Sequence, residues 1–312
     1  MPLVSICIPA YNCAGFIAET MDCLFNQTYK AVEIILVNDG STDETLTLLK
    51  EKIRAGVFLI DQPNLGASAA RNAAYQQASG EFIIFFDADD YIGPDFIELQ
   101  MRKIRELDNA VVLSAWGRFY RSDHETFALN KCPVEEMTFP EWIGYYWLNG
   151  NPMTNPGRAI IPRALLEAGG LWNEQLSLND DFEFFTRIFL QAKKIIFNQD
   201  ALFYYRSGVS GLSGTRGVAA DHSYYRSVEL AVDQVLAVYG TKPALREACA
   251  NIWQLFVYSI YPHSSDLTQK AELKIKSLGG ASLPFPSGRV TRLLSHLIGW
   301  KAAAKIRSFF NR

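Results

Sequence analysis

Short, mostly apolar runs alternate with longer amphipathic segments through the first hundred residues, and this alternation restricts the possible folds strongly. The apolar runs span 3–8, 32–37, 57–60 and 81–86, with helix-like stretches between them. A strand that is apolar along its whole length is buried on both faces, which is typical of a parallel sheet covered by helices. The pattern therefore predicts βαβ units and an α/β fold with a mostly parallel central sheet.

The second half of the chain changes character. Further strands are expected at 110–116, 157–161 and 195–205, shorter helices at 163–168 and 182–190, and an irregular, aromatic-rich stretch at 124–155. From about residue 219 the apolar residues follow long helical periods, at 222–239, 243–261, 269–276 and 288–310. The Gly- and Ser-rich segment 207–217 separates the two patterns. We therefore predict an α/β domain over 1–215 and a helical extension over 216–312.

Composition argues against several classes of protein. The chain has 312 residues, of which 49% are hydrophobic and 20% charged, as in a globular protein with a sizeable core. A formal net charge of -3 argues against a nucleic-acid partner, because phosphate binding needs a basic face. The 5 cysteines are odd in number and lack metal-ligand spacing, which indicates a reduced, cytoplasmic setting. No apolar run reaches the roughly 18 residues of a membrane span.

Polar side chains follow the predicted strands at the points where these end. Asp87-Ala88-Asp89-Asp90 directly follows the apolar run at 82–86. Hard divalent cations take oxygen ligands and bridge to phosphates, so this Asp-x-Asp triplet suits a metal–diphosphate site. Turn formation and helix capping are the alternative interpretation of such acidic residues. Tyr11, Asn38 and Asp39 end two other predicted strands, and ligands bind at the carboxyl ends of such sheets, so we expect these residues to lie near the triplet.

Several ordered motifs resemble a known family, the inverting family 2 glycosyltransferases of the GT-A fold. In chain order the matching pieces are Pro9-Ala10-Tyr11-Asn12, Asn38 to Asp43, Gly66 to Asn72, Asp87 to Asp90, Gly170 to Glu174, Asp180 to Glu183 with Arg187, and Tyr205-Arg206. The resemblance covers roughly residues 3 to 215, and an ordered set of motifs is far more specific than any single one. It implies a GT-A fold, Rossmann-like with flanking helices, followed by the helical extension.

The resemblance implies a nucleotide-sugar site in the N-terminal half of the chain. Asp39 would accept hydrogen bonds from the nucleobase, Tyr11 would pack on the base, and Arg71 would meet the nucleotide or its diphosphate. Asp89 would hold Mg²⁺ or Mn²⁺ against both phosphates, with Asp87 nearer the ribose, so these two residues are the predicted metal ligands. The remaining predicted contacts of the nucleotide-sugar are Pro9, Asn12, Ala88 and Arg206.

The second implied centre is Asp180-Asp181, at a position where the family usually has Glu-Asp. Asp181 would be the general base that removes the acceptor's hydroxyl proton, and Asp180 replaces the glutamate. A neighbouring carboxylate raises a pKa, which suits a base that acts near neutral pH. The alternative is that both residues only cap the following helix. Because this chain has Asp-Asp where the family has Glu-Asp, the sequence leaves open which of the two carboxylates faces the acceptor.

Three further residues have two interpretations each. Trp172 is a candidate for stacking on the acceptor sugar, although a tryptophan at such a junction also fits the core. Arg206 either contacts the diphosphate or is structural. His222 matches a late histidine that some family members use as a metal ligand, but a lone helix histidine is more often unliganded, and we leave it outside the site.

The segment 289–312 carries six basic residues and no acidic one, with apolar residues at helical spacing. A basic amphipathic helix lies either on an anionic membrane surface or against the rest of the domain, and the sequence favours neither. Membrane contact through this tail would place the protein peripherally on the inner membrane face.

Together these features predict a metal-dependent enzyme that moves a sugar from a nucleotide donor, uridine-based by preference, to a hydroxyl of a glycan or lipid-linked acceptor in cell-surface polysaccharide synthesis. A polyprenyl-phosphate sugar synthase is the nearest alternative among enzymes. A catalytically silent nucleotide-sugar or membrane-binding module is the alternative outside enzymes. Dehydrogenases, kinases and nucleophile-elbow hydrolases are disfavoured, because the chain lacks Gly-x-Gly-x-x-Gly, a phosphate loop ending in Gly-Lys, and Gly-x-Ser-x-Gly.

Overall fold

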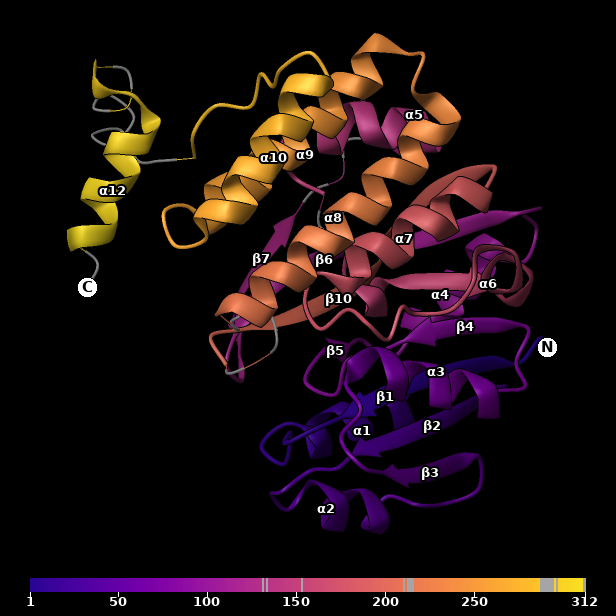
Figure 1. Cartoon of the computed structure of the whole chain (residues 1–312). Helices are drawn as coiled ribbons and strands as arrows, with labels where there is room; N and C mark the ends of the chain where they lie inside the picture. Colours follow the sequence, from indigo (N-terminus) through magenta and orange to yellow (C-terminus); the bar gives the residue numbers. More distant parts are fainter. Residues whose placement is uncertain are drawn as a thin grey trace. The chain divides into compact units, whose positions relative to one another are not determined.

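The computed structural model of the chain divides it into two compact units (Figure 1). The structure describes residues 1–130, 132, 134–152, 154–209, 211, 216–286, 295 and 297–310. The first unit contains 1–139 and 154–214, and the second contains 140–153 and 215–312. The segment 140–153, which the sequence analysis placed in the α/β domain, thus belongs to the helical unit.

The first unit is built around a mixed, mostly parallel sheet. Its strands follow the order β3-β2-β1-β4-β9-β6-β10-β5, with β7 beside β6 and β8 beside β10. Parallel pairing joins β1 (Val4–Ala10), β2 (Val32–Asp39), β3 (Val57–Gln62) and β4 (Phe82–Phe85). The helices α1 (Ile17–Phe25), α2 (Thr45–Glu51) and α3 (Ala67–Gln77) connect these strands.

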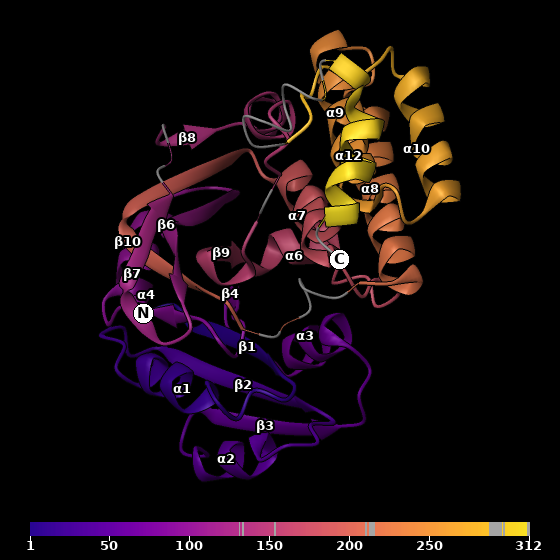
Figure 2. The ribbon, with the colours of Figure 1, turned by 90° about the vertical axis from the view of Figure 1, so that its left-hand side faces the viewer.

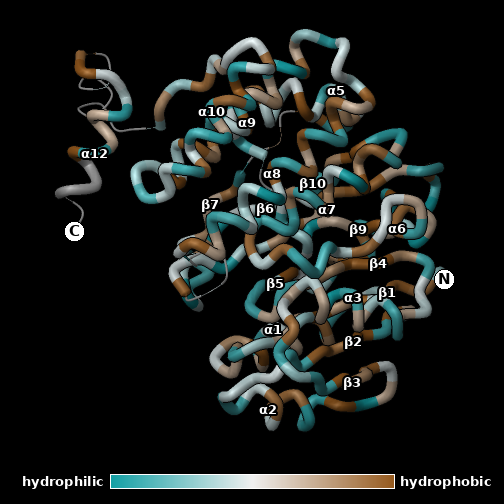
Figure 3. Tube along the Cα trace, viewed as in Figure 1, coloured by the Kyte–Doolittle hydropathy of each residue, from teal (hydrophilic) through white to brown (hydrophobic). Residues whose placement is uncertain are grey.

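The central strands are buried on both faces, as their continuous hydrophobicity predicts. Ile6, Cys7 and Ile8 of β1 point alternately to opposite faces, yet each is fully buried. Figure 3 shows the same property as brown, hydrophobic stretches along the sheet. All 5 cysteines are free thiols.

The second half of the sheet lies beyond β4. It contains β5 (Tyr91–Ile92), β6 (Ala110–Tyr120), β7 (Asp123–Asn130), β8 (Glu136–Met137), β9 (Ala159–Pro162) and β10 (Lys194–Ser207), with β6 and β10 parallel to each other. Three helices, α4 (Phe96–Ile104), α6 (Arg163–Gly169) and α7 (Asp180–Gln191), and the 3₁₀ turn η2 (Pro156–Arg158) complete this unit.

The expectation of an irregular stretch at 124–155 was wrong for its first part. Residues Asp123–Asn130 form β7, which pairs antiparallel with β6. Most of its side chains are exposed, so the strand lacks the buried alternating face that makes a strand recognisable in a sequence.

The helical unit contains α8 (Val218–Tyr239), α9 (Pro243–Ile260), α10 (Ser265–Ser277) and α12 (Trp300–Phe310). Figure 2 shows α8, α9 and α10 side by side. The helix α5 (Phe139–Trp142) leads into this unit, and the π-helix η1 (Ile143–Trp147) packs on α9. In α9, Asn251 donates to the carbonyl of Leu148 at 2.8 Å.

The predicted basic tail is described only in part. Residues 289–294, 296, 311 and 312 lie outside the described residues, as do the side chains of 307–310. In the described part, Trp300 packs on Tyr258 and Tyr261, Ala303 is buried, and Lys301 pairs with Glu272 at 2.7 Å. These residues pack against the helical unit, and membrane contact through the tail stays a prediction. Within the described residues, no helix combines the length and hydrophobicity that crossing a membrane requires.

A buried carboxylate ties the first two strands to the turn after α3. Glu33 of β2 accepts hydrogen bonds from the Ser5 hydroxyl at 2.6 Å, the Ser79 amide at 2.6 Å and the Gly80 amide at 3.1 Å. Burial would raise the pKa of Glu33, but these hydrogen bonds outweigh it and hold the pKa below its ordinary value. The ionised carboxylate therefore stabilises the fold above that ordinary pKa, and acidification removes the effect.

We predict that Glu33→Ala destabilises the protein, because it removes the acceptor of the Ser5 hydroxyl and the Ser79 amide and leaves the buried Gly80 amide only its bond to Ser5. A loss of about 3 kcal/mol is expected, which corresponds to roughly 6 to 12 °C in melting temperature for a unit of this size. Thermal unfolding followed by circular dichroism at pH 7 measures the shift, which should shrink at acidic pH. Glu51→Ala, at an exposed position of α2, is the control; equal melting temperatures for the two variants would contradict the prediction.

Candidate functional site

The predicted donor residues lie where β1, β2 and β4 end at one edge of the sheet (Figure 1). Asn12 links the first two of these ends: its amide donates to the Ser41 hydroxyl at 3.1 Å, and its side-chain oxygen accepts from the Thr42 amide at 2.8 Å. Pro9 is partly exposed at the end of β1, and the Tyr11 side chain is 50% exposed. A half-exposed aromatic ring beside ordered loops suits packing against a flat ligand.

Asp39, at the end of β2, orders the loop between β3 and α3. Its Oδ1 accepts from the Gln62 side chain at 2.8 Å and the Leu65 amide at 2.9 Å, and its Oδ2 accepts from the Gly66 amide at 2.9 Å. A carboxylate oxygen has two lone pairs, so Oδ2 keeps capacity for one further donor. Because Gly66 has φ +94, a conformation that suits glycine, this arrangement also sets where α3 begins.

Arg71 of α3 connects the Asp-x-Asp triplet to the start of α7. The buried guanidinium donates from Nη2 to Asp87 at 2.8 Å and from Nη1 to Asp180 at 2.9 Å. Ser68, one turn earlier on α3, donates to the same Asp180 oxygen at 3.0 Å. A planar guanidinium holds two carboxylates in a defined geometry that a flexible lysine does not reproduce. We call Asp87, Arg71 and Asp180 the arginine bridge.

The arginine bridge makes the surroundings of the neighbouring carboxylates Asp180 and Asp181 different. Asp180 is engaged by Arg71 and Ser68, whereas Asp181 accepts only the amide hydrogen of Phe182, at 2.8 Å, among the interactions of the described residues. Burial, followed by repulsion from Asp180, raises the pKa of Asp181 to about 7. Asp181 is therefore a carboxylate that can take up a proton near neutral pH.

The triplet is oriented by contacts to its backbone. Thr20 of α1 donates to the carbonyls of Ala88 at 3.0 Å and Asp90 at 3.1 Å, and the Arg206 side chain donates to the carbonyl of Asp89. The Arg206 amide donates to the Asp90 carboxylate at 2.9 Å. Ala88 and Asp90 are buried, while Asp87 and Asp89 stay partly exposed.

Two predicted contacts have other partners in the structure. The Arg206 side chain is fully buried and forms an ion pair with Glu19 at 2.6 Å, which favours its structural interpretation over a diphosphate contact. The Trp172 ring is buried and stacks on Phe184, with ring centroids 4.0 Å apart, and the Arg71 guanidinium lies 4.3 Å from its centre. The geometry gives Trp172 a packing role and does not favour a contact with an acceptor sugar.

The triplet fits a divalent cation. Burial and repulsion from Asp87 raise the pKa of Asp89 to about 6, so ionising both carboxylates is costly unless a positive charge lies nearby. Among the described residues, Asp89 has no ion-pair partner for its carboxylate, and no group of three His, Cys, Asp or Glu side chains forms a metal site. Mg²⁺ is typically held by one or two carboxylates together with substrate phosphates, which matches Asp87 and Asp89.

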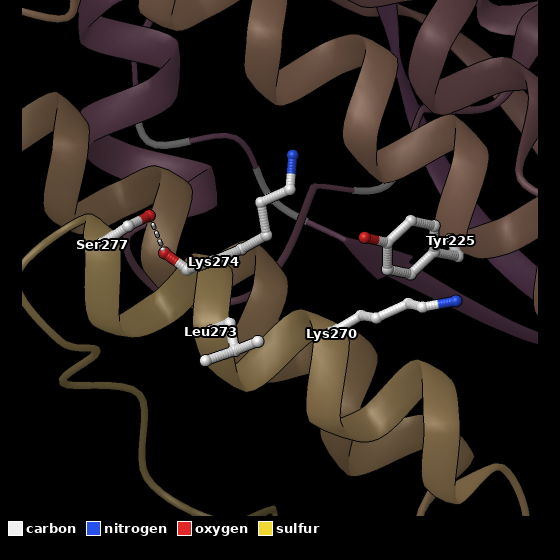
Figure 4. A pocket seen from close by; sticks show the side chains of 5 residues that line it. All are labelled: Tyr225, Lys270, Leu273, Lys274 and Ser277. Atoms are coloured by element: carbon white, nitrogen blue, oxygen red, sulfur yellow. Dashed lines mark hydrogen bonds between the residues drawn. The ribbon is translucent and has the colours of Figure 1, made fainter.

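A shallow depression in the second unit is not part of this site. It measures about 300 Å³ and is lined by Tyr225, Lys270, Leu273, Lys274 and Ser277 (Figure 4). Its two lysines are paired with Asp266 and Glu229. Paired surface lysines do not make a binding site for an anion.

The sequence reasoning missed three residues of the site. Ser68 lies three positions before Arg71 on α3, so its place on the same helix face could have been found from spacing alone. Thr20 and Glu19 belong to no motif. Only the fold brings α1 to the back of the triplet.

Comparisons with known proteins agree with this architecture. The model of the family described as Glycosyl transferase family 2 matches residues 5–170. Glycosyltransferase GlyG of Streptococcus pneumoniae serotype 4 is 31% identical over 65% of this chain and 70% of its own length. Chondroitin synthase of Pasteurella multocida is 43% identical over 33% of this chain, which spans only 11% of that protein.

The same fold occurs in a solved structure. TarS residues 1–349 of S. aureus, crystallised in complex with UDP-GlcNAc, superimposes with a TM-score of 0.70 and 20% identity, covering 97% of this chain and 90% of that one. The expected GT-A fold with a helical C-terminal extension is confirmed.

We predict that Arg71→Met destabilises the protein, because it leaves Asp87 and Asp180 as uncompensated charges. Removing one partner of a buried ion pair costs about 3 to 5 kcal/mol, so the melting temperature should fall by roughly 10 °C. Adding Asp180→Asn should restore part of the loss. Arg102→Met, which breaks an exposed pair with Glu98, is the control and should change the melting temperature little. An Arg71→Met variant as stable as this control would contradict the proposed bridge.

Proposed function

The chain belongs to glycosyl transferase family 2, and from this premise we propose that it transfers a sugar from a UDP-sugar to a hydroxyl group of a glycan or lipid-linked acceptor. The observation that carries the proposal is the arginine bridge, which engages Asp87 and Asp180 and leaves the neighbouring Asp89 and Asp181 without ion pairs among the described residues. One carboxylate is thus available beside the donor loop and one at the start of α7.

On the donor side, Asp89 and Asp87 would hold Mg²⁺ or Mn²⁺. The cation would supply positive charge to a leaving nucleoside diphosphate, which lowers the barrier without proton transfer. Tyr11 and Asp39, at the ends of β1 and β2, suit the nucleobase. The proposal of a uridine donor is supported by the complexes of TarS with UDP-GlcNAc and with UDP.

On the acceptor side, Asp181 would remove the hydroxyl proton as the acceptor oxygen attacks the anomeric carbon in line, so that the leaving group departs from the opposite face and the configuration inverts. Asp180 does not compete for this role, because Arg71 and Ser68 already bind its carboxylate. A base with a pKa of about 7 is well matched to a reaction near neutral pH.

The raised pKa of Asp181 favours a hydroxyl acceptor over a polyprenyl phosphate. A phosphate acceptor is already ionised and needs no strong base, so a carboxylate with a raised pKa would have no task there. The name of the relative chondroitin synthase supports a role in polysaccharide synthesis.

The donor class is tested by melting the protein with UDP, GDP, CDP or ADP, each with and without Mn²⁺. A ligand present at 100 times its dissociation constant stabilises by about 2.7 kcal/mol, which should raise the melting temperature by roughly 5 to 10 °C. We expect UDP with Mn²⁺ to give the largest shift and EDTA to abolish it. A shift that ignores EDTA would contradict the metal role, and no shift with any nucleotide would contradict the enzyme assignment.

The base is tested by the rate of UDP release from a UDP-sugar in the presence of a polysaccharide acceptor. Because Asp181 acts in its ionised form, the rate should rise with pH through about 7, and Asp181→Asn should lower it by about 100-fold or more. Asp180→Asn removes a neighbouring negative charge, which lowers the pKa of Asp181, so the midpoint of the acid limb should move to lower pH.

The matched control for these variants is Glu174→Gln. Glu174 is exposed and accepts a hydrogen bond from Asn72 that glutamine also accepts. Its pH profile should match that of the unaltered protein. Full activity of Asp181→Asn, or an unmoved midpoint in Asp180→Asn, would show that Asp181 is not the base.

A further inference from the structure

The back of the Asp-x-Asp loop carries a network that the proposed function does not use. Arg206, at the end of β10, has a fully buried side chain that donates four hydrogen bonds to protein atoms. Besides the Asp89 carbonyl and Glu19, it reaches the carbonyl of Arg121 and the Ser122 hydroxyl. Its guanidinium also lies 4.9 Å from the ring centre of Phe16 and 4.5 Å from that of Phe119.

Glu19 of α1 holds this arginine in place. Its Oε2 accepts from Arg206 Nη2 at 2.6 Å, and its Oε1 contacts His124 Nε2 at 2.8 Å. Thr20, the next residue, donates to the carbonyls of Ala88 and Asp90. Every backbone carbonyl from Ala88 to Asp90 is therefore bound by a side chain of α1 or β10.

We propose that Glu19 and Arg206 are positioning residues of the metal site, which hold the loop backbone so that the carboxylate of Asp89 stays oriented for a divalent cation. The inference rests on the proposed function, because it assumes that Asp89 binds the metal. Of the two interpretations of Arg206 that the sequence left open, a diphosphate contact and a structural role, it takes the structural one.

The physical reason is the cost of orienting a carboxylate. If Asp89 could turn freely, cation binding would have to order it, which weakens binding. Because the loop is held at three consecutive carbonyls, Asp89 is already ordered before the cation binds. Groups that orient a metal ligand without touching the metal typically change metal affinity by about 10- to 100-fold when they are mutated. The buried guanidinium also needs Glu19, because an unpaired buried charge is unfavourable.

The test measures Mn²⁺ binding in the presence of UDP by electron paramagnetic resonance, which reports the free ion and requires no turnover. Glu19→Ala should weaken Mn²⁺ binding by 10-fold or more, and Glu19→Gln, which keeps a hydrogen-bond acceptor without the charge, should weaken it less. In activity assays, the Mn²⁺ concentration for half-maximal rate should rise, while the rate at saturating Mn²⁺ should fall much less.

The matched control is Asp22→Asn, on the same helix. Asp22 pairs with Lys52 at 2.8 Å and, among the described residues, forms no hydrogen bond or ion pair with the Asp-x-Asp loop, so the substitution should leave Mn²⁺ binding unchanged. Thermal melting of each variant identifies any that fail to fold, and Arg206→Lys provides a second route to the same loop if Glu19→Ala unfolds.

The outcomes separate this inference from the proposed function. If the unaltered protein binds Mn²⁺ with UDP, but the folded Glu19 and Arg206 variants bind it equally well, the positioning role is wrong and the metal role stands. If the unaltered protein binds no Mn²⁺ with UDP, the metal role fails and the positioning role fails with it.

Discussion

A single buried arginine determines the arrangement of this site. Arg71 brings together Asp87, from the end of β4, and Asp180, from the start of α7, which are far apart in the sequence. A guanidinium with little exposure to water is stable only while carboxylates compensate its charge, so both aspartates are held by the same requirement. The Asp-x-Asp loop and the start of α7, to which we assign the donor and the base in the proposed function, therefore take up a defined relation within one unit.

Asp89 and Asp181, which form no ion pair with Arg71, are the carboxylates for which ionisation is unfavourable. Burial and neighbouring charge raise the pKa of Asp89 and Asp181, which means that ionising them disfavours the folded state. A neutral amide side chain would avoid this cost at either position. Such a pattern is typical of functional sites, where shifted pKa values accompany chemistry.

The sequence predicted the parts of the molecule that depend on local pattern. Mostly apolar runs predicted β1 to β4. Motif order singled out Asp39 and Asp89 after strands and Asp181 at a helix start, because ligand chemistry restricts which residue types occur at such positions. It did not predict β7, whose side chains are mostly exposed, or the neighbours of Trp172 and Arg206. Those contacts depend on side chains from distant elements, and a tryptophan or arginine looks the same in a sequence whether it meets a ligand or the protein interior.

The helical unit is built from two separate segments of the chain, and this affects where the protein can be truncated. Because 140–153 belongs to that unit, the polypeptide passes between the two units three times, and Ile143 and Trp147 depend on α9 for their burial. A fragment that ended near residue 215 would keep η1 and lose the helix that covers it, which would expose large apolar side chains to water and favour aggregation. Dissection of this protein is therefore better done by internal replacement than by C-terminal truncation.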